Sequence, residues 1–130
     1  MNLLDYADIF VSVCNFLPII KEIIQLELLS KNHQYIIRNN NWFKEVRVKN
    51  DSVLEHILTN YKFKWLHIFS NCDVNKFIKE LKNCHTLYLS WTNITDASVK
   101  ELKNCHTLYL RGTNITDKCI NKLRSYGCCI

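Results

Sequence analysis

The sequence predicts a mixed α/β chain, in which a short N-terminal three-helix bundle precedes a repeated strand–turn–helix array of the solenoid type. Three observations predict it: a nearly literal repeat with a period of 21 residues, period-two alternation inside each repeat, and helical apolar spacing before the repeats. We expect the helical bundle at residues 1–48, a connecting helix at 49–63 and the repeats at 64–130.

The repeat is the strongest signal. Residues 80–97 read ELKNCHTLYLSWTNITDA and residues 101–118 read ELKNCHTLYLRGTNITDK. An earlier, degenerate copy begins near Lys64, with Leu66 and Ile68 one period before the corresponding leucines of the next copy. The first copy is imperfect, as the terminal coil of a stacked array often is, because it has a neighbour on one side only.

Each repeat has the chemistry of a strand followed by a turn and a short helix. Residues 85–89 alternate with period two, which places Leu87 and Leu89 on a buried face. Thr95 is a good N-cap, and Asp96 is favourable in the first turn of the helix that follows. The spacing of Val99 and Leu102 then gives that helix an apolar side.

This pattern resembles leucine-rich repeats with an L-x-L-x-x-T-x-I-T-D core. The matching residues are Leu87, Leu89, Thr92, Ile94, Thr95 and Asp96, then Leu108, Leu110, Thr113, Ile115, Thr116 and Asp117. The resemblance implies short parallel strands on a concave face and short helices on a convex face.

Outward strand positions of such a concave sheet are its usual ligand surface. The candidates that we expect to bind a partner are Trp65, His67, Phe69, Tyr88, Ser90, Tyr109 and Arg111, with Thr86 and Thr107 between them. Tyr and Arg side chains dominate the binding energy of many protein interfaces. The same residues also fit a second interpretation, as cross-strand pairs without a binding role, and the sequence leaves both open.

The N-terminal part shows three helical stretches with apolar sides. The first runs through Ile9, Phe10, Val13, Phe16 and Leu17, and Pro18 suits the first turn of the next. Ser30 is a fair N-cap for a third helix, which residues 39–41 end with three asparagines.

These stretches resemble an F-box. Residues 8–10 and 13–17 are similar to its opening, residues 28–31 to its V-S-K element, and Trp42 to the tryptophan that closes it, although Asp5-Tyr6 stands where F-boxes have Leu-Pro. The resemblance implies docking on a Skp1-like adaptor through Ile9, Phe10, Val13, Phe16, Leu17, Leu29 and Trp42. An arbitrary helical cap for the repeats is the alternative. The F-box and repeat proteins of giant DNA viruses of amoebae are similar in architecture and composition.

The charge of the chain is uneven. Residues 1–58 hold six Lys/Arg and seven Asp/Glu, a net −1, whereas residues 59–130 hold eleven and five, a net +6. A basic half fits nucleic acid. The lysines fall where helices should face water, however, so we favour a solvated helical face and do not expect a nucleic-acid partner.

The seven cysteines predict buried thiols in a reducing compartment. Their number is odd and no secretory signal or membrane-spanning run opens the chain, so we expect a cytoplasmic or nuclear protein (in the host cell, if viral). Cys84-His85 and Cys105-His106 offer the donors of a zinc site, but stacking of coils alone brings the cysteines into register. We therefore predict no metal and no other cofactor.

No catalytic motif stands out. A phosphate-binding loop of the G-x-x-x-x-G-K type is excluded by two glycines in the whole chain, and no motif orients a Cys/His nucleophilic pair. We therefore expect a non-enzymatic adaptor, which the resemblance identifies as a substrate receptor of a Skp1–cullin–F-box ubiquitin ligase. The alternative is a repeat-type interaction module with a helical cap.

Overall fold

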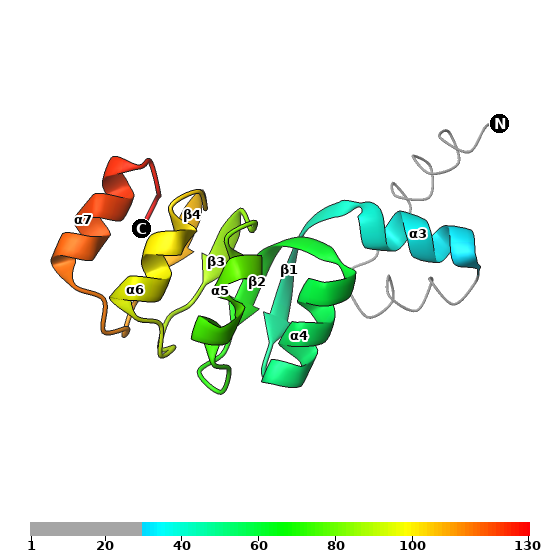
Figure 1. Cartoon of the computed structure of the whole chain (residues 1–130), viewed down its shortest axis with the longest axis horizontal. Helices are drawn as coiled ribbons and strands as arrows, with labels where there is room; N and C mark the ends of the chain where they lie inside the picture. The colour runs from blue at the N-terminus through cyan, green and yellow to red at the C-terminus, as the bar shows by residue number, and fades with distance from the viewer. Residues whose placement is uncertain (1–29) are drawn as a thin grey trace. The chain divides into compact units, whose positions relative to one another are not determined.

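The computed structural model describes residues 30–130, and the chain is drawn in Figure 1. The first two helical stretches expected from the sequence lie outside the described residues. Contacts divide the chain into two compact units, of which the described parts are residues 30–41 with 60–62, and residues 42–59 with 63–130.

The first unit contains α3 (Lys31–Asn39), which is the third helix expected from the sequence. The Ser30 hydroxyl accepts a hydrogen bond from the His33 backbone N–H at 3.1 Å, which satisfies one of the unpaired donors of the first turn. The Asn40 N–H closes the last turn on the Ile36 carbonyl. Ile36 and Ile37 are buried, and the Arg38 guanidinium donates to Asn60 Oδ1 at 3.1 Å.

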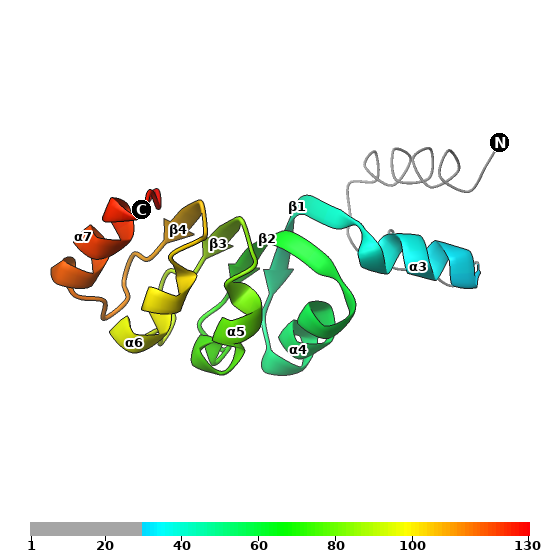
Figure 2. The same ribbon diagram turned by 45° about the horizontal axis from the view of Figure 1, so that its top comes forward.

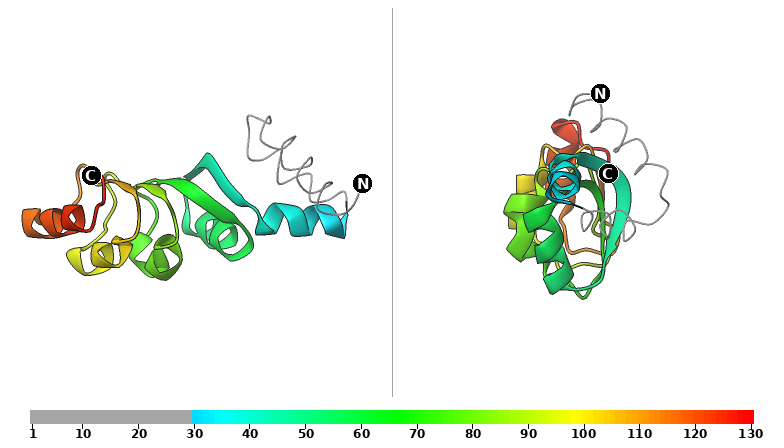
Figure 3. Two further views of the ribbon diagram at one scale, coloured as in Figure 1. Left: turned by 90° about the horizontal axis from the view of Figure 1, so that it is seen from above. Right: turned by 90° about the vertical axis from the view of Figure 1, so that its right-hand side faces the viewer.

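The second unit is a four-stranded sheet in the order β1-β2-β3-β4, with helices between consecutive strands. β2 pairs with β3 and β3 with β4 in parallel. The elements are β1 (Asn41–Val48), α4 (Asp51–Asn60), β2 (Lys62–Ile68), η2 (Val74–Phe77), α5 (Ile78–Leu81), β3 (Thr86–Tyr88), α6 (Asp96–Val99), η3 (Lys100–Leu102), β4 (Thr107–Tyr109) and α7 (Asp117–Ser125). Within this unit the helices follow one another on one side of the strands (Figures 2 and 3).

The register of the strands equals the period of the sequence. Trp65 is paired with Thr86 and Thr86 with Thr107, so each step from strand to strand is 21 residues. Leu66, Leu87 and Leu108 consequently lie side by side, each with no exposed surface. The helix expected within residues 49–63 is present as α4, and Cys129 continues the sheet through a parallel bridge to Thr107.

β1 was not expected, because the sequence analysis assigned residues 42–48 to the end of a helical region. Its exposure alternates, with Trp42, Val46 and Val48 buried. The backbone N–H of Phe69 donates to the Val48 carbonyl at 3.0 Å. The strand is compatible with its sequence, since aromatic and β-branched residues favour extended backbone.

Polar side chains join consecutive strand–turn–helix units, called coils below, at their turns. The Asp73 N–H donates to Asp51 Oδ1 at 2.9 Å, and the Thr95 N–H to Asn75 Oδ1 at 3.3 Å. In the last step, Asp96 accepts from the Thr116 N–H at 3.0 Å and from the Thr116 hydroxyl at 2.7 Å. Each turn therefore obtains its hydrogen bonds from the coil before it.

One turn holds a non-glycine residue in a left-handed conformation. Trp91 has φ 63° and Gly112, one period later, has φ 72°, so the turn requires positive φ in both coils. The Trp91 indole lies against Gly112, where a Cβ would overlap the ring, and the Trp91 side chain is still 66% exposed. Glycine at position 112 thus adopts the positive φ that the turn requires and leaves room for the Trp91 indole of the preceding coil.

Replacing Gly112 with alanine should destabilise the protein more in the wild-type chain than in a Trp91→Gly background. In the wild type, the left-handed backbone costs roughly 1–2 kcal/mol and overlap with the indole adds about 1–3 kcal/mol. Only the backbone cost is left once the indole is removed. Urea unfolding followed by circular dichroism measures both losses. Equal losses would show that the two positions do not interact.

Candidate functional site

The candidate site is a strip of aromatic rings on the strand face of the second unit. The ring centroids of Tyr88 and Tyr109 are 4.0 Å apart with an interplanar angle of 1°. His67 stacks on Tyr88 at 5.2 Å and on Phe69 at 4.7 Å, and Trp65 stacks on Tyr88 at 6.4 Å. Five of the seven candidates, four on β2, β3 and β4 and Phe69 directly after β2, are therefore in one continuous series of ring contacts, which we call the aromatic strip.

The parallel register positions this strip. Outward side chains at the same place in successive repeats become direct neighbours, because His67 is paired with Tyr88 and Tyr88 with Tyr109. Exposure rises along the series, from half-buried Tyr88 to Tyr109, which is 43% exposed. The strip thus ends at β4 on an accessible aromatic ring.

The two other candidates follow the strands at the same end of the sheet. Ser90 is half-buried and comes two residues after Tyr88, whereas Arg111 is exposed and comes two residues after Tyr109. The Arg111 carbonyl accepts from the Trp91 N–H at 2.8 Å. Arg111 therefore adds an exposed positive charge two residues beyond Tyr109.

Several residues of this face were missed by the sequence analysis because β1 was missed. Glu45 on β1 lies 3.3 Å from His67 Nδ1 and 3.6 Å from Arg47 Nε. The Lys49 ammonium lies 5.7 Å from the centre of the Phe69 ring, a cation–π arrangement. The alternation of β1 was the signal that could have found them.

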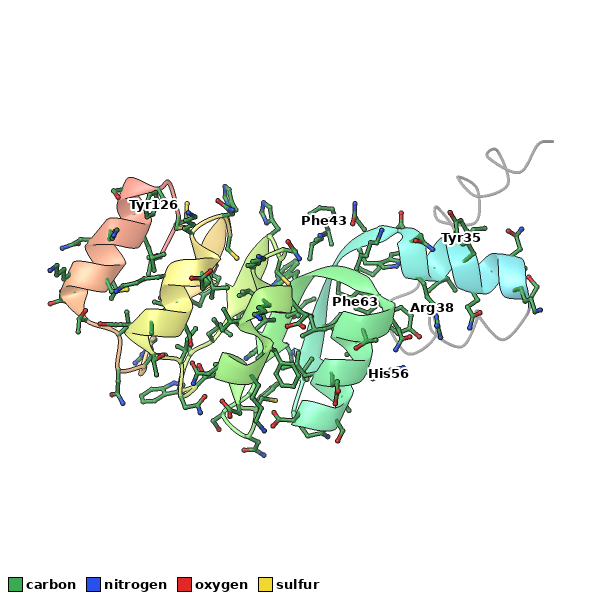
Figure 4. All side chains as sticks on the ribbon, viewed as in Figure 1. Tyr35, Arg38, Phe43, His56, Phe63 and Tyr126 are labelled. Atoms are coloured by element: carbon green, nitrogen blue, oxygen red, sulfur yellow. The ribbon has the colours of Figure 1, made fainter. Side chains whose placement is uncertain are left out.

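A second aromatic row runs along the start of the strands. Phe43, which Figure 4 labels, meets the His85 ring edge-on at 5.9 Å, and His85 stacks on His106 at 4.6 Å. Phe43 is 61% exposed. This row comes from the same register, because the two histidines are one period apart, and it widens the aromatic surface toward β1.

Of the Skp1-contact candidates, Trp42 alone falls within the described residues. Ile9, Phe10, Val13, Phe16, Leu17 and Leu29 lie outside the described residues. Trp42 is described: it lies in β1 and is 1% exposed. It stands one period before buried Phe63, and Cys84 and Cys105 follow at further steps of 21 residues. Its ring therefore occupies an interior position of the repeat and does not present a surface to a partner.

Hydrogen bonds shift the pKa of two polar side chains, Tyr88 and Asp96. The pKa of the Tyr88 hydroxyl is raised, first by its hydrogen bond with the Tyr109 side chain. The pKa of the Asp96 carboxyl is lowered by the Thr116 N–H and hydroxyl, which favour its charged form. Tyr88 therefore keeps its proton at neutral pH and Asp96 stays ionised.

Five of the described cysteines are interior thiols: Cys72, Cys84, Cys105, Cys119 and Cys128. Cys84 Sγ lies 3.5 Å from the Phe63 carbonyl oxygen, and Cys105 Sγ lies 3.8 Å from that of Leu81, in each case in the preceding coil. Burial raises the pKa of both thiols to about 12. A thiol in this state is a poor nucleophile, since the thiolate is the reactive form.

The described residues offer no assembled metal-binding group. Across residues 30–130, no three His, Cys, Asp or Glu side chains are grouped so that they could hold a metal ion. Over the same range no helix has the length and apolar character to cross a membrane. No protein-family model matches the chain, and no match was found among curated proteins or solved structures.

Cys84 and Cys105 should resist alkylation in the folded protein. Iodoacetamide at pH 7.5 should modify exposed Cys129 within minutes and leave the two interior thiols unmodified, because a pKa of about 12 keeps them protonated. Peptide mass spectrometry with and without urea gives the comparison. Rapid modification of Cys84 in the native protein would contradict its interior placement.

Proposed function

We propose that this chain is a non-catalytic interaction adaptor whose strand face binds a partner protein. The observation that carries the proposal is the aromatic strip, in which rings from three adjoining strands form one partly exposed surface. Aromatic and arginine side chains give large contact area for little loss of conformational freedom, and they dominate interface energies. Tyr109 and Arg111 at the accessible end are the residues that we expect to contribute most.

We further propose that the second unit is a leucine-rich-repeat array. The identity of strand register and sequence period supports this, as do the hydrogen bonds that each turn receives from the preceding coil. In such an array the strand face is the usual binding surface. The proposed binding face and the proposed fold are therefore consistent with one another.

The role as a ubiquitin-ligase substrate receptor is a proposal that rests on the sequence of the N-terminal part. The pattern at residues 8–17 and 28–31 supports docking on a Skp1-like adaptor, with α3 as the helix that follows its V-S-K element. In this arrangement the N-terminal part binds the Skp1-like adaptor of the ligase and the aromatic strip binds the substrate protein.

One observation favours the alternative, an interaction module without a ligase role. Trp42, which the resemblance assigned to the end of an F-box, has an interior repeat position 21 residues before Phe63. Its presence is thus explained by packing alone. The two functions share the strand face and differ only in whether the N-terminal part binds Skp1.

Truncation of the accessible end of the aromatic strip should abolish partner binding. Affinity capture from cell extract, quantified by mass spectrometry, should show partner proteins that the Tyr109→Ala/Arg111→Ala variant loses, because hot-spot truncations commonly cost about 2 kcal/mol or more each. A helix-side variant, Lys79→Ala/Lys82→Ala, is the control and should retain them. Retention of every partner by the strand-face variant would contradict the proposal.

The ligase role is tested by capture of a recombinant Skp1–cullin pair on the purified chain. Phe16→Lys/Leu17→Lys should abolish capture, since two charges replace apolar contacts each worth roughly 1.5–3 kcal/mol when buried. The Tyr109→Ala/Arg111→Ala variant should capture Skp1 normally. If the wild-type chain, shown to be folded by circular dichroism, captures nothing, the interaction module without a ligase role is the better description.

A further inference from the structure

The groove between the last two helical layers concentrates positive charge. Two adjoining hollows of about 190 and 240 Å³ share Lys100, Cys119 and Lys122 in their walls. Lys103 lines the smaller hollow and Lys118 the larger one. Four lysines, from η3, the residue directly after it and α7, therefore surround one region, which we call the lysine groove.

Two of these four ammonium groups have an electrostatic neighbour in the described part of the chain: Lys100 lowers the pKa of Asp96, and Lys103 lies 5.9 Å from the centre of the Tyr126 ring. No carboxylate of residues 30–130 lies within 4 Å of any of the four ammonium groups. Asp96 is the single acid in the walls, and both its oxygens accept hydrogen bonds from Thr116. Four lysines against one aspartate give the groove a net charge of +3.

The preceding groove of the same unit provides an internal comparison. It lies between α5 and α6 and is lined by three lysines and two glutamates, a net +1. Glu101 in its wall becomes Lys122 one period later, and Ala97 becomes Lys118. These two differences add three positive charges, and the remaining differences between the walls, such as Asn75 to Asp96, bring the net increase to two. The lysine groove is therefore a local feature and not a consequence of overall composition.

The size and charge of the groove favour one class of ligand. The smaller hollow has room for a single anionic group, with Leu123 and the Tyr126 ring beside the lysines; Figure 4 labels Tyr126 at the end of α7. A carboxylate or a phosphodiester brings one negative charge, whereas a phosphate monoester brings about −1.5 to −2 at pH 7 and three acceptor oxygens. Each ammonium supplies up to three donors, which matches several oxygens on one group.

We propose that the lysine groove binds a phosphate monoester. The proposal is independent of the adaptor function, because Lys100, Lys118 and Lys122 belong to η3 and α7 whereas the aromatic strip comes from the strands. The helices lie on one side of these strands (Figure 3). A phosphorylated side chain of a partner and a free phosphorylated metabolite share this chemistry. The monoester relieves the repulsion among the four ammonium groups, which is the physical source of its affinity.

The test is a titration of the full chain at low salt by calorimetry or fluorescence anisotropy. The probes are a ten-residue phosphoserine peptide, the same peptide without phosphate, glucose 6-phosphate, and a 20-nucleotide oligothymidylate. The variant Lys118→Ala/Lys122→Glu gives the groove the residues of the preceding coil, so its fold should be kept. Lys76→Ala/Lys79→Glu makes the same change of charge in the preceding groove and is the matched control.

The phosphoserine peptide or glucose 6-phosphate should bind saturably, and the Lys118→Ala/Lys122→Glu variant should weaken binding by about tenfold or more, with the matched control within about twofold of wild type. Binding of the peptide alone identifies a phosphorylated partner, and equal binding of glucose 6-phosphate identifies a small molecule. Three results overturn the proposal: no saturable binding of either monoester, equal weakening by both variants, or preferential binding of the oligonucleotide.

Discussion

The 21-residue parallel register is the constraint on which the rest of the second unit depends. A single strand, turn and short helix cannot bury its own leucines; they become buried only when the next coil places the same residues beside them. Leu66, Leu87 and Leu108 meet this requirement with no exposed surface. A shift of one residue between strands would turn these side chains outward, so the register fixes the interior and the surface together.

The same register aligns equivalent residues of successive coils in rows across the sheet. Where a coil repeats a residue, its copies stand next to each other, so Tyr88 contacts Tyr109 and His85 contacts His106. Where two successive coils differ at a position, the two differing residues occupy equivalent places in otherwise similar coils, as Glu101 and Lys122 do. The aromatic strip and the lysine groove thus have one origin, although they occupy opposite sides of the sheet and differ in the ligands that they favour.

The parts of the fold that recur in the sequence could be predicted from it, and the parts that occur once could not. The strands of the two nearly identical copies, their buried leucines and the N-cap threonines follow from the printed residues. β1 was missed because it carries no leucine and no second copy reveals its register, so Trp42 was assigned by resemblance instead. The positive φ of Trp91 was missed as well, although the two printed repeats set Trp91 opposite Gly112, a residue that commonly adopts positive φ.

Position in the array changes the burial of equivalent side chains. Ile94 is 1% exposed and Val99 is fully buried, whereas their counterparts Ile115 and Ile120 are half-buried. The residue types are similar and the period is the same, so the difference comes from the coil that covers one pair and not the other. The interior of each coil is thus completed by its neighbour.

A surface residue such as Tyr109 is accessible for the same reason, because no further ring stacks on it within the described residues. Stability and binding therefore compete for the same faces: each added coil buries the rings that would otherwise meet a partner, and the accessible end of the aromatic strip lies where the stacking stops.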